Sequence, residues 1–347
     1  MFVYWGAKWC PPCNQVKATL FNRQDFIERS RAFVPVYVDG DSPGAQKIGA
    51  RFKVSGYPTM VLFTPQGQEL TRLPGEVEPV RYTEVLTLGM NAARPVSAVL
   101  ADALATPTSL TANDWRLLAF YSWDTDHQQL IAKDRLPATL LALADAAPKD
   151  APDVAMRLRL KALVAADAKK PVPVDAATRA AVVALLGDAA QTREQTDMVT
   201  GYAAEIVRAL SAKGSTERSA LLAAFDVALK RLEADPVLSR ADRMQALIAQ
   251  VDLARIDVAE ADAGKPGAKP AAPVVLPEAL LADVRAQTAR ADREITDGYE
   301  RQAVITAAAY LLEHAGPSLF SKASRYQRKA SALSPRFLAL LASSDIR

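Results

Sequence analysis

The sequence changes character near residue 94, and this change constrains the fold more than any other feature of the chain. Before it, short runs rich in β-branched and aromatic residues alternate with segments whose apolar side chains have helical spacing. The predicted strands are 2–5, 33–39, 59–64 and 69–73, and the predicted helices are 11–29, 42–54 and 78–92. The order β-α-β-α-β-β-α, with a crossover first and a hairpin later, predicts an α/β domain with a mixed sheet and helices on both faces.

Beyond this point the pattern is helical throughout. In the segments 216–232 and 239–260, apolar residues recur on one helical face. Turns that carry Pro or Gly separate the segments, and Asp150 and Ser239 stand where helix N-caps are expected. We therefore predict an all-α region of helical hairpins in a solenoid-like array, although no fixed repeat period stands out. The predicted divisions of the chain are an α/β domain at 1–93, an all-α domain at 94–347 and a linker at 263–273.

The composition excludes several classes of function. The net charge of +3 arises from 42 basic and 39 acidic residues that are scattered along the chain, so no basic block predicts a nucleic-acid partner. No apolar run is long enough to span a bilayer, and no signal peptide is visible. Because Met1 leads directly into a predicted buried strand, we expect further residues upstream of it in the complete protein.

The chemistry of the chain is concentrated in Cys10 and Cys13, its only two cysteines. A cysteine at a helix N-terminus lies near the positive end of the helix dipole, which favours the thiolate and makes Cys10 a candidate nucleophile. Cys13, one turn later, lies on the same face and can close a disulfide, and Pro12 is compatible with a first helical turn. A zinc site needs about four ligands. His127 and His314 are far away in the helical part, so we predict no metal site, while an incidental cysteine pair stays open.

Two motifs resemble those of the thioredoxin family. Trp9-Cys10-Pro11-Pro12-Cys13 follows a predicted strand and opens a predicted helix, as the family's Trp-Cys-x-x-Cys motif does. The second is "GYPT", in which Pro58 immediately precedes the predicted strand 59–64. Motif, proline and order of elements agree over residues 1–93, and the resemblance does not extend to the rest of the chain.

The resemblance implies roles for several residues. Pro58 is expected to be cis and to lie beside the cysteine pair, with Tyr57 flanking it and the preceding backbone pairing with substrate. Trp9 is expected at the rim of the substrate groove. Pro11 and Pro12 form the active-site turn. The chain departs from thioredoxins in lacking their first strand and helix, and Tyr4 stands where they carry a buried Asp, which favours a specialised relative.

The resemblance also implies a function. It predicts a thiol–disulfide oxidoreductase that reduces protein disulfides, with Cys10 as an exposed nucleophile, Cys13 as a shielded resolving thiol, an upstream thiol reductant and no cofactor. The alternative is a helical partner-binding or scaffold protein with an accessory thioredoxin-like module. A specialised redox protein with only two cysteines fits the periplasm, and the cytoplasm stays open as the alternative because no signal peptide is visible. We expect the helices after residue 94 either to select the protein substrate or to cover the sheet.

Overall fold

The structure of the protein is a computed structural model. It describes residues 1–10, 13, 16–17, 20–73, 79–123, 126, 130–166, 174–257, 278–280, 282–283, 286–287 and 290. The predicted linker at 263–273 lies outside the described residues.

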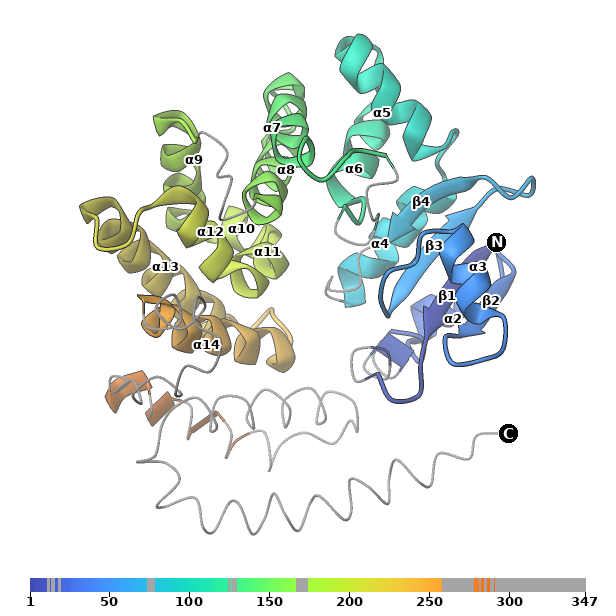
Figure 1. Ribbon diagram of the computed structural model, residues 1–347. Coiled ribbons are helices and arrows are strands. Elements are labelled where there is room, and N and C mark those ends of the chain that lie inside the picture. Colours follow the sequence, from blue (N-terminus) through green and yellow to red (C-terminus); the bar gives the residue numbers. More distant parts are fainter. Residues whose placement is uncertain are drawn as a thin grey trace, which may run out of the picture.

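A four-stranded mixed sheet forms the N-terminal part of the protein (Figure 1). Its strands are β1 (Phe2–Gly6), β2 (Pro35–Asp39), β3 (Thr59–Phe63) and β4 (Glu69–Leu73). They lie in the order β2-β1-β3-β4, with β1 parallel to β2 and antiparallel to β3, which pairs with β4 as a hairpin. This arrangement confirms the predicted mixed sheet and its order of elements.

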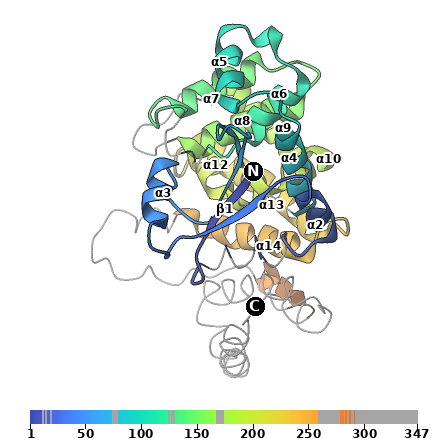
Figure 2. The same ribbon diagram turned by 90° about the vertical axis from the view of Figure 1, so that its right-hand side faces the viewer.

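Helices cover both faces of the sheet because side chains alternate along β1. Phe2 and Tyr4 point into one apolar cluster, and Val3 and Trp5 point into another, which includes Phe52. Helix α3 (Ala45–Arg51) lies on one side of β1, while α2 (Gln24–Ser30) and α4 (Pro79–Met90) lie on the other (Figure 2). Helix α4 approaches the sheet closely at Gly89, where a Cβ atom would lie 2.7 Å from a methyl carbon of Leu62.

The prediction of one continuous helix over 11–29 is wrong. Helical backbone is present at 13, 16 and 17, the chain turns over 20–23, and α2 follows. Phe21 lies in this turn, and its ring packs edge-on against Tyr4 and stacks on Phe26, at centroid distances of 5.0 and 4.9 Å. Aromatic packing therefore outweighs the local helical preference of the segment.

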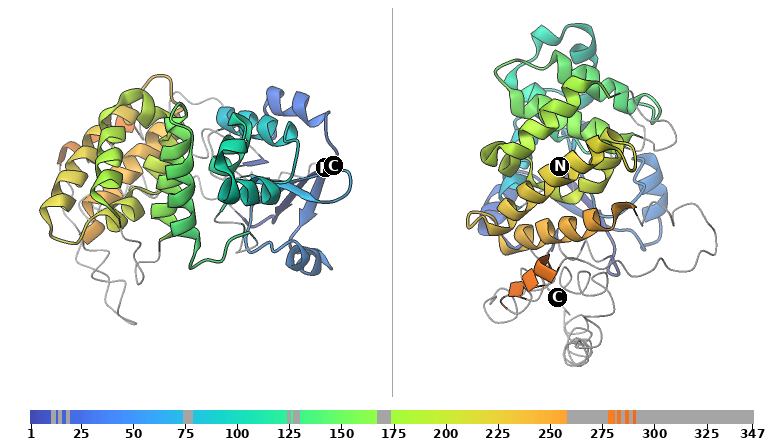
Figure 3. Two further views of the ribbon diagram at one scale, coloured as in Figure 1. Left: turned by 90° about the horizontal axis from the view of Figure 1, so that it is seen from above. Right: turned by 90° about the vertical axis from the view of Figure 1, so that its left-hand side faces the viewer.

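Helices and turns make up the described residues from 96 onward, with no strand among them, which confirms the predicted all-α region. The helices are α5 (Val96–Ala105), α6 (Ala112–Phe120), α7 (Leu136–Ala146), α8 (Pro152–Ala165), α9 (Ala176–Gly187), α10 (Ala189–Glu194), α11 (Thr196–Gly201), α12 (Ala203–Leu210), α13 (Thr216–Ala234) and α14 (Arg240–Ala254). Consecutive helices α7 and α8, and likewise α13 and α14, pack against each other as hairpins. Seen from above, α5 and α6 lie between the sheet and the later helices (Figure 3).

One of the two predicted N-caps is confirmed. The hydroxyl of Ser239 accepts a hydrogen bond from the backbone N–H of Asp242 at the start of α14. Asp150 does not cap a helix, because α8 begins one residue later than this assignment requires and its N-cap is Ala151. Pro152 at the first position of α8 has no N–H and leaves one donor fewer to be capped.

Two apolar cores meet at α8. The first begins at the sheet and continues without interruption through α4, α5, α6 and α7 to Val154, Leu158 and Ala162. The second is formed by α8, α9 and α11 to α14, and it begins with Met156 and Leu160 on another face of the same helix. The sheet and the first helices of the all-α region thus share one core.

Candidate redox site

Cys10 and Cys13 form a disulfide just after the end of β1. Their Cα atoms are 5.2 Å apart, and the backbone N–H of Cys10 donates to the carbonyl of Ala7. Cys10 is 3% exposed and Cys13 is fully buried. The expected exposure of Cys10 is therefore wrong for the disulfide form, because its sulfur packs against the backbone of Tyr57.

A hydrogen bond from backbone to side chain connects the two cysteines in addition to the disulfide. The N–H of Cys13 donates to Cys10 Sγ over 3.2 Å. When the disulfide is reduced, an N–H aimed at this sulfur stabilises negative charge on it. The geometry therefore favours Cys10 as the thiolate.

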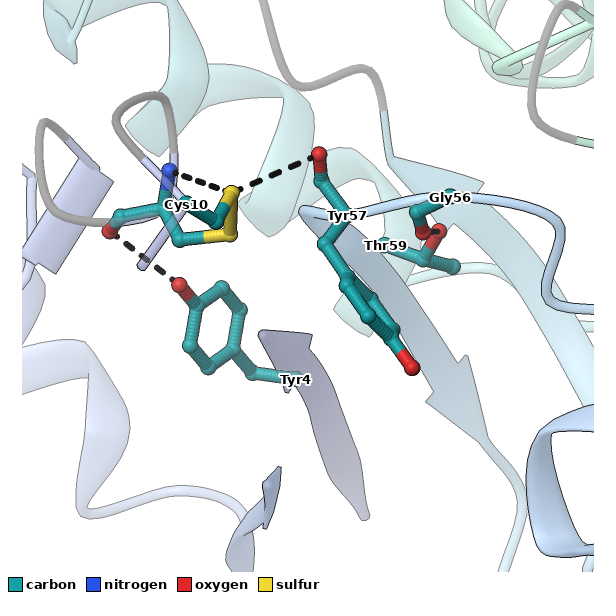
Figure 4. The surroundings of a disulfide bond; sticks show 6 residues. Tyr4, Cys10, Gly56, Tyr57 and Thr59 are labelled. Atoms are coloured by element: carbon teal, nitrogen blue, oxygen red, sulfur yellow. Dashed lines mark hydrogen bonds between the residues drawn. A yellow bond between two sulfur atoms is a disulfide. The ribbon is translucent and has the colours of Figure 1, made fainter. Parts of the chain in front are cut away.

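The segment around Pro58 forms the opposite wall of the site (Figure 4). The Tyr57–Pro58 peptide bond is cis, as the resemblance implied, and the carbonyl oxygen of Tyr57 lies 3.6 Å from Cys10 Sγ. The Tyr57 ring packs over Gly40, where a Cβ atom would come within 2.2 Å of it. The structure therefore brings Tyr57 and Pro58 beside the cysteine pair.

Trp9 lies at the exposed rim of the same site. Its side chain is 67% exposed, and its ring meets the Tyr57 ring edge-on at a centroid distance of 6.4 Å. Its role in contacting substrate stays a prediction, as do the substrate-binding roles of Tyr57 and Pro58. Pro11 and Pro12, the predicted active-site turn, lie outside the described residues.

Tyr4 contacts the cysteine pair from below, out of β1 (Figure 4). Its hydroxyl donates a hydrogen bond of 3.1 Å to the carbonyl oxygen of Cys13. Burial, with a smaller contribution from Tyr37, raises the pKa of Tyr4 well above its usual value, so the hydroxyl stays neutral and remains a donor. Gly6 makes room for this hydroxyl, since a Cβ atom there would lie 2.7 Å from it.

Lys17 completes the surroundings and is the residue that the sequence reading missed. Its ammonium nitrogen lies 4.6 Å from the ring centroid of Tyr37 and 5.9 Å from that of Tyr4. The spacing of four residues from Cys13 was the available signal, because residues i and i+4 of a helix share a face.

The described residues contain no group of three or more His, Cys, Asp or Glu side chains that could hold a metal ion. His127 and His314 both lie outside the described part of the chain. Among the described helices, none is long and apolar enough to cross a membrane.

The fold and the cysteine pair together define a thioredoxin-like domain. Residues 1–89 match a family model described as thioredoxin-like domain, and the rest of the chain lies outside this match. No curated protein and no solved structure matches the chain significantly. A thioredoxin-like domain with a closed cysteine pair indicates a redox function for the N-terminal part.

Proposed function

We propose that the protein is a thiol–disulfide oxidoreductase that reduces disulfide bonds of protein substrates through Cys10 and Cys13. The observation that carries this proposal is the Cys10–Cys13 disulfide in which the Cys13 N–H also donates to Cys10 Sγ, at 3.2 Å. This arrangement can hold two electrons as a dithiol and release them by closing the disulfide.

The reaction begins from the dithiol. The Cys10 thiolate attacks one sulfur of the substrate disulfide, the substrate S–S bond breaks, and the departing substrate thiolate takes up a proton. The Cys13 thiolate then attacks Cys10 Sγ and displaces the second substrate thiolate, which is also protonated. Two electrons have passed to the substrate, and an upstream thiol reductant must return two electrons to the Cys10–Cys13 disulfide.

The walls of the site suggest how a substrate is aligned. Trp9 offers an exposed ring at the rim, and the backbone at Tyr57 faces Cys10 Sγ at 3.6 Å. A substrate chain that lies between these two residues brings its disulfide to Cys10. Because Cys10 and Cys13 are both buried in the disulfide form, the bound chain has to open the rim of the site before thiol–disulfide exchange occurs.

The helical region has two candidate roles in this function. We infer that α5 to α8 support the redox domain, because they share its apolar core. Selection of the protein substrate remains the proposal for the helices beyond α8. The ion pair between Arg81 of α4 and Glu194 of α10, at 2.7 Å, ties these later helices to the redox domain.

Insulin reduction in the full-length protein tests the proposal. The wild-type protein is expected to accelerate the precipitation of reduced insulin in the presence of dithiothreitol, and Cys10→Ser is expected to abolish the acceleration. Cys13→Ser should accumulate mixed disulfides with substrate, because attack on Cys10 is lost, and Cys10→Ser should not. Equal trapping by both variants would contradict the assignment of roles.

The competing function is a helical partner-binding or scaffold protein in which the thioredoxin-like part is structural. The near-complete burial of both sulfurs is the observation that favours it. Thiol titration with and without reductant separates the two functions. A pair that opens and closes reversibly supports the oxidoreductase, whereas a disulfide that resists reduction in the folded protein supports the scaffold.

A further inference from the structure

A lysine is held beside the cysteine pair by two aromatic rings. Tyr4 and Tyr37 are opposite each other in the parallel β1–β2 pair, and their rings stack at a centroid distance of 5.6 Å with an interplanar angle of 25°. The Lys17 ammonium lies over both rings, 4.6 Å from the centroid of Tyr37 and 5.9 Å from that of Tyr4. Cation–π attraction therefore fixes the position of a long, otherwise flexible side chain.

Tyr4, one of these two rings, also contacts Cys13. The Tyr4 hydroxyl donates to the Cys13 carbonyl at 3.1 Å, so the ring beneath Lys17 is also in contact with the backbone of the second cysteine. Lys17 follows Cys13 by four residues, and both have helical backbone, so their side chains leave the same helical face.

Burial and two charged neighbours determine the pKa of Lys17. Asp39 at the end of β2 attracts the ammonium and raises its pKa, while Lys8, after β1, lowers it. Burial is the largest influence and leaves the pKa of Lys17 below its usual value. The half-buried lysine is therefore less screened by water than an exposed one, and its charge acts more strongly on nearby groups.

We propose that Lys17 is a positioning residue for the second step of the reaction, in which its charge stabilises the Cys13 thiolate. This inference rests on the proposed oxidoreductase function. Cys13 loses its proton to solvent, the resulting thiolate attacks Cys10 Sγ of the mixed disulfide, and the substrate thiolate leaves with the electron pair of the broken bond. Lys17 remains protonated throughout, so atoms and electrons balance without it.

The test uses the two-step reaction of the reduced full-length protein with 5,5′-dithiobis(2-nitrobenzoate), followed by stopped flow. Attack by Cys10 releases one equivalent of coloured thiolate, and attack by Cys13 on the mixed disulfide releases a second. Cys13→Ser identifies the second phase, because that variant stops after the first equivalent. The pH dependence of the second phase reports ionisation of Cys13.

Lys17→Gln is expected to slow the second phase at pH 7 by about threefold to tenfold, which corresponds to a rise of roughly 0.5 to 1 unit in the pKa of Cys13. Lys17→Arg keeps the charge and stacks well on aromatic rings, so it should restore the wild-type rate and pH profile. Lys47→Gln removes an exposed lysine from α3, on the other side of the sheet, and should change neither phase.

Two results would overturn the inference while the oxidoreductase function stands. One is a second phase in Lys17→Gln with the wild-type rate and pH midpoint. The other is equal slowing in Lys17→Gln and Lys17→Arg, which would indicate a purely structural role. A wild-type protein that shows no first phase would overturn both the inference and the proposed function.

Discussion

The backbone N–H of Ser122 donates a hydrogen bond of 3.0 Å to the carbonyl oxygen of Arg72. Arg72 lies on β4, which is at one edge of the sheet, and an edge strand has backbone groups that need partners. The segment after α6 thus covers the edge of the redox domain. The adjacent Tyr121 strengthens this contact, because its hydroxyl donates to the buried carboxylate of Asp126 and lies 3.4 Å from a carboxylate oxygen of Glu69.

The first prediction concerns this edge contact. Tyr121→Phe keeps the ring but leaves the Asp126 carboxylate, which is 2% exposed, with one donor fewer. We expect the free energy of unfolding to fall by about 1–3 kcal/mol, measured by urea denaturation. Tyr37→Phe, at a ring that is 48% exposed, is the control and should change it by less than about 0.5 kcal/mol. Equal effects would show that the edge contact contributes little.

The second prediction concerns the shared core. Leu100 of α5 is 6% exposed and belongs to the same apolar cluster as Phe2 and Leu62 of the sheet, whereas Leu104 of the same helix is 56% exposed. Leu100→Ala should reduce the free energy of unfolding by about 2–5 kcal/mol, and Leu104→Ala by less than about 0.5 kcal/mol. Hydrogen exchange should also show weaker protection of β1 and β3 in Leu100→Ala alone. Unchanged strand protection would mean that the two parts unfold independently.

The strands were predictable because their signals are local. The segment 60–63 is uniformly apolar and 69–73 follows a Gly-bearing turn, and both were found where β-branched residues and turns predict them. The segment 11–29 was harder, since its apolar spacing is helical but the packing of Phe21 against Tyr4 breaks the helix. Side-chain contacts between distant segments are not encoded in local periodicity.

The candidate site, too, was predictable only where its signals are local in the sequence. The cysteine spacing and the Pro58 motif were readable because each has a local signature. The sharing of one core by the sheet and α5 was not, because a helical stripe shows that one face is buried and does not say against which element. Lys17 was missed for a similar reason, since its position depends on the rings of Tyr4 and Tyr37, which come from two other segments.

The third prediction concerns acid stability. The guanidinium of Arg157, 1% exposed, pairs with the carboxylate of Asp197, with one N–O distance of 3.0 Å. Burial opposes ionisation of Asp197, but Arg157 outweighs it and lowers the pKa of this carboxyl. A lowered folded-state pKa contributes stability above the unfolded-state value of about 3.9, and this contribution is lost as the pH falls below about 4.

Asp197→Asn should therefore reduce the free energy of unfolding at pH 7 by about 3–5 kcal/mol, because it leaves a buried charge unpaired. Its pH profile should be flatter than that of the wild type below about pH 4. Asp226→Asn is the control, because it breaks an ion pair with Lys230 in which both side chains are exposed, 52% for Asp226 and 59% for Lys230. It should change the free energy of unfolding by less than about 0.5 kcal/mol. Chemical denaturation at a series of pH values measures both effects, and parallel profiles for Asp197→Asn and the wild type would contradict the expectation.

The fourth prediction concerns the Tyr4 hydroxyl. Tyr4→Phe preserves the ring pair with Tyr37 but removes the donor to the Cys13 carbonyl. We expect a loss of about 0.5–1.5 kcal/mol in the free energy of unfolding, as for one buried hydrogen bond. Urea denaturation of the oxidised protein measures it, with Tyr37→Phe again as the control. A Tyr4→Phe protein as stable as the control would show that water or another donor replaces the hydroxyl.

The last prediction concerns redox poise. The sequence between the cysteines is Pro11-Pro12, and proline has no backbone N–H, so this turn lacks two donors that could stabilise a Cys10 thiolate. The N–H of Cys13 is retained and donates to Cys10 Sγ. A dithiol form whose thiolate accepts fewer N–H hydrogen bonds is a better reductant, because oxidation to the disulfide then gives up less thiolate stabilisation. We therefore expect the protein to act as a reductant, with a potential well below that of the strongest dithiol oxidants at about −120 mV.

Equilibration with glutathione at defined ratios of reduced and oxidised forms, with the fraction of dithiol measured by alkylation, gives this potential. Replacing Pro11 by Gly adds one N–H to the turn and should shift the potential toward more oxidising values, whereas a wild-type potential near −120 mV would contradict the expectation.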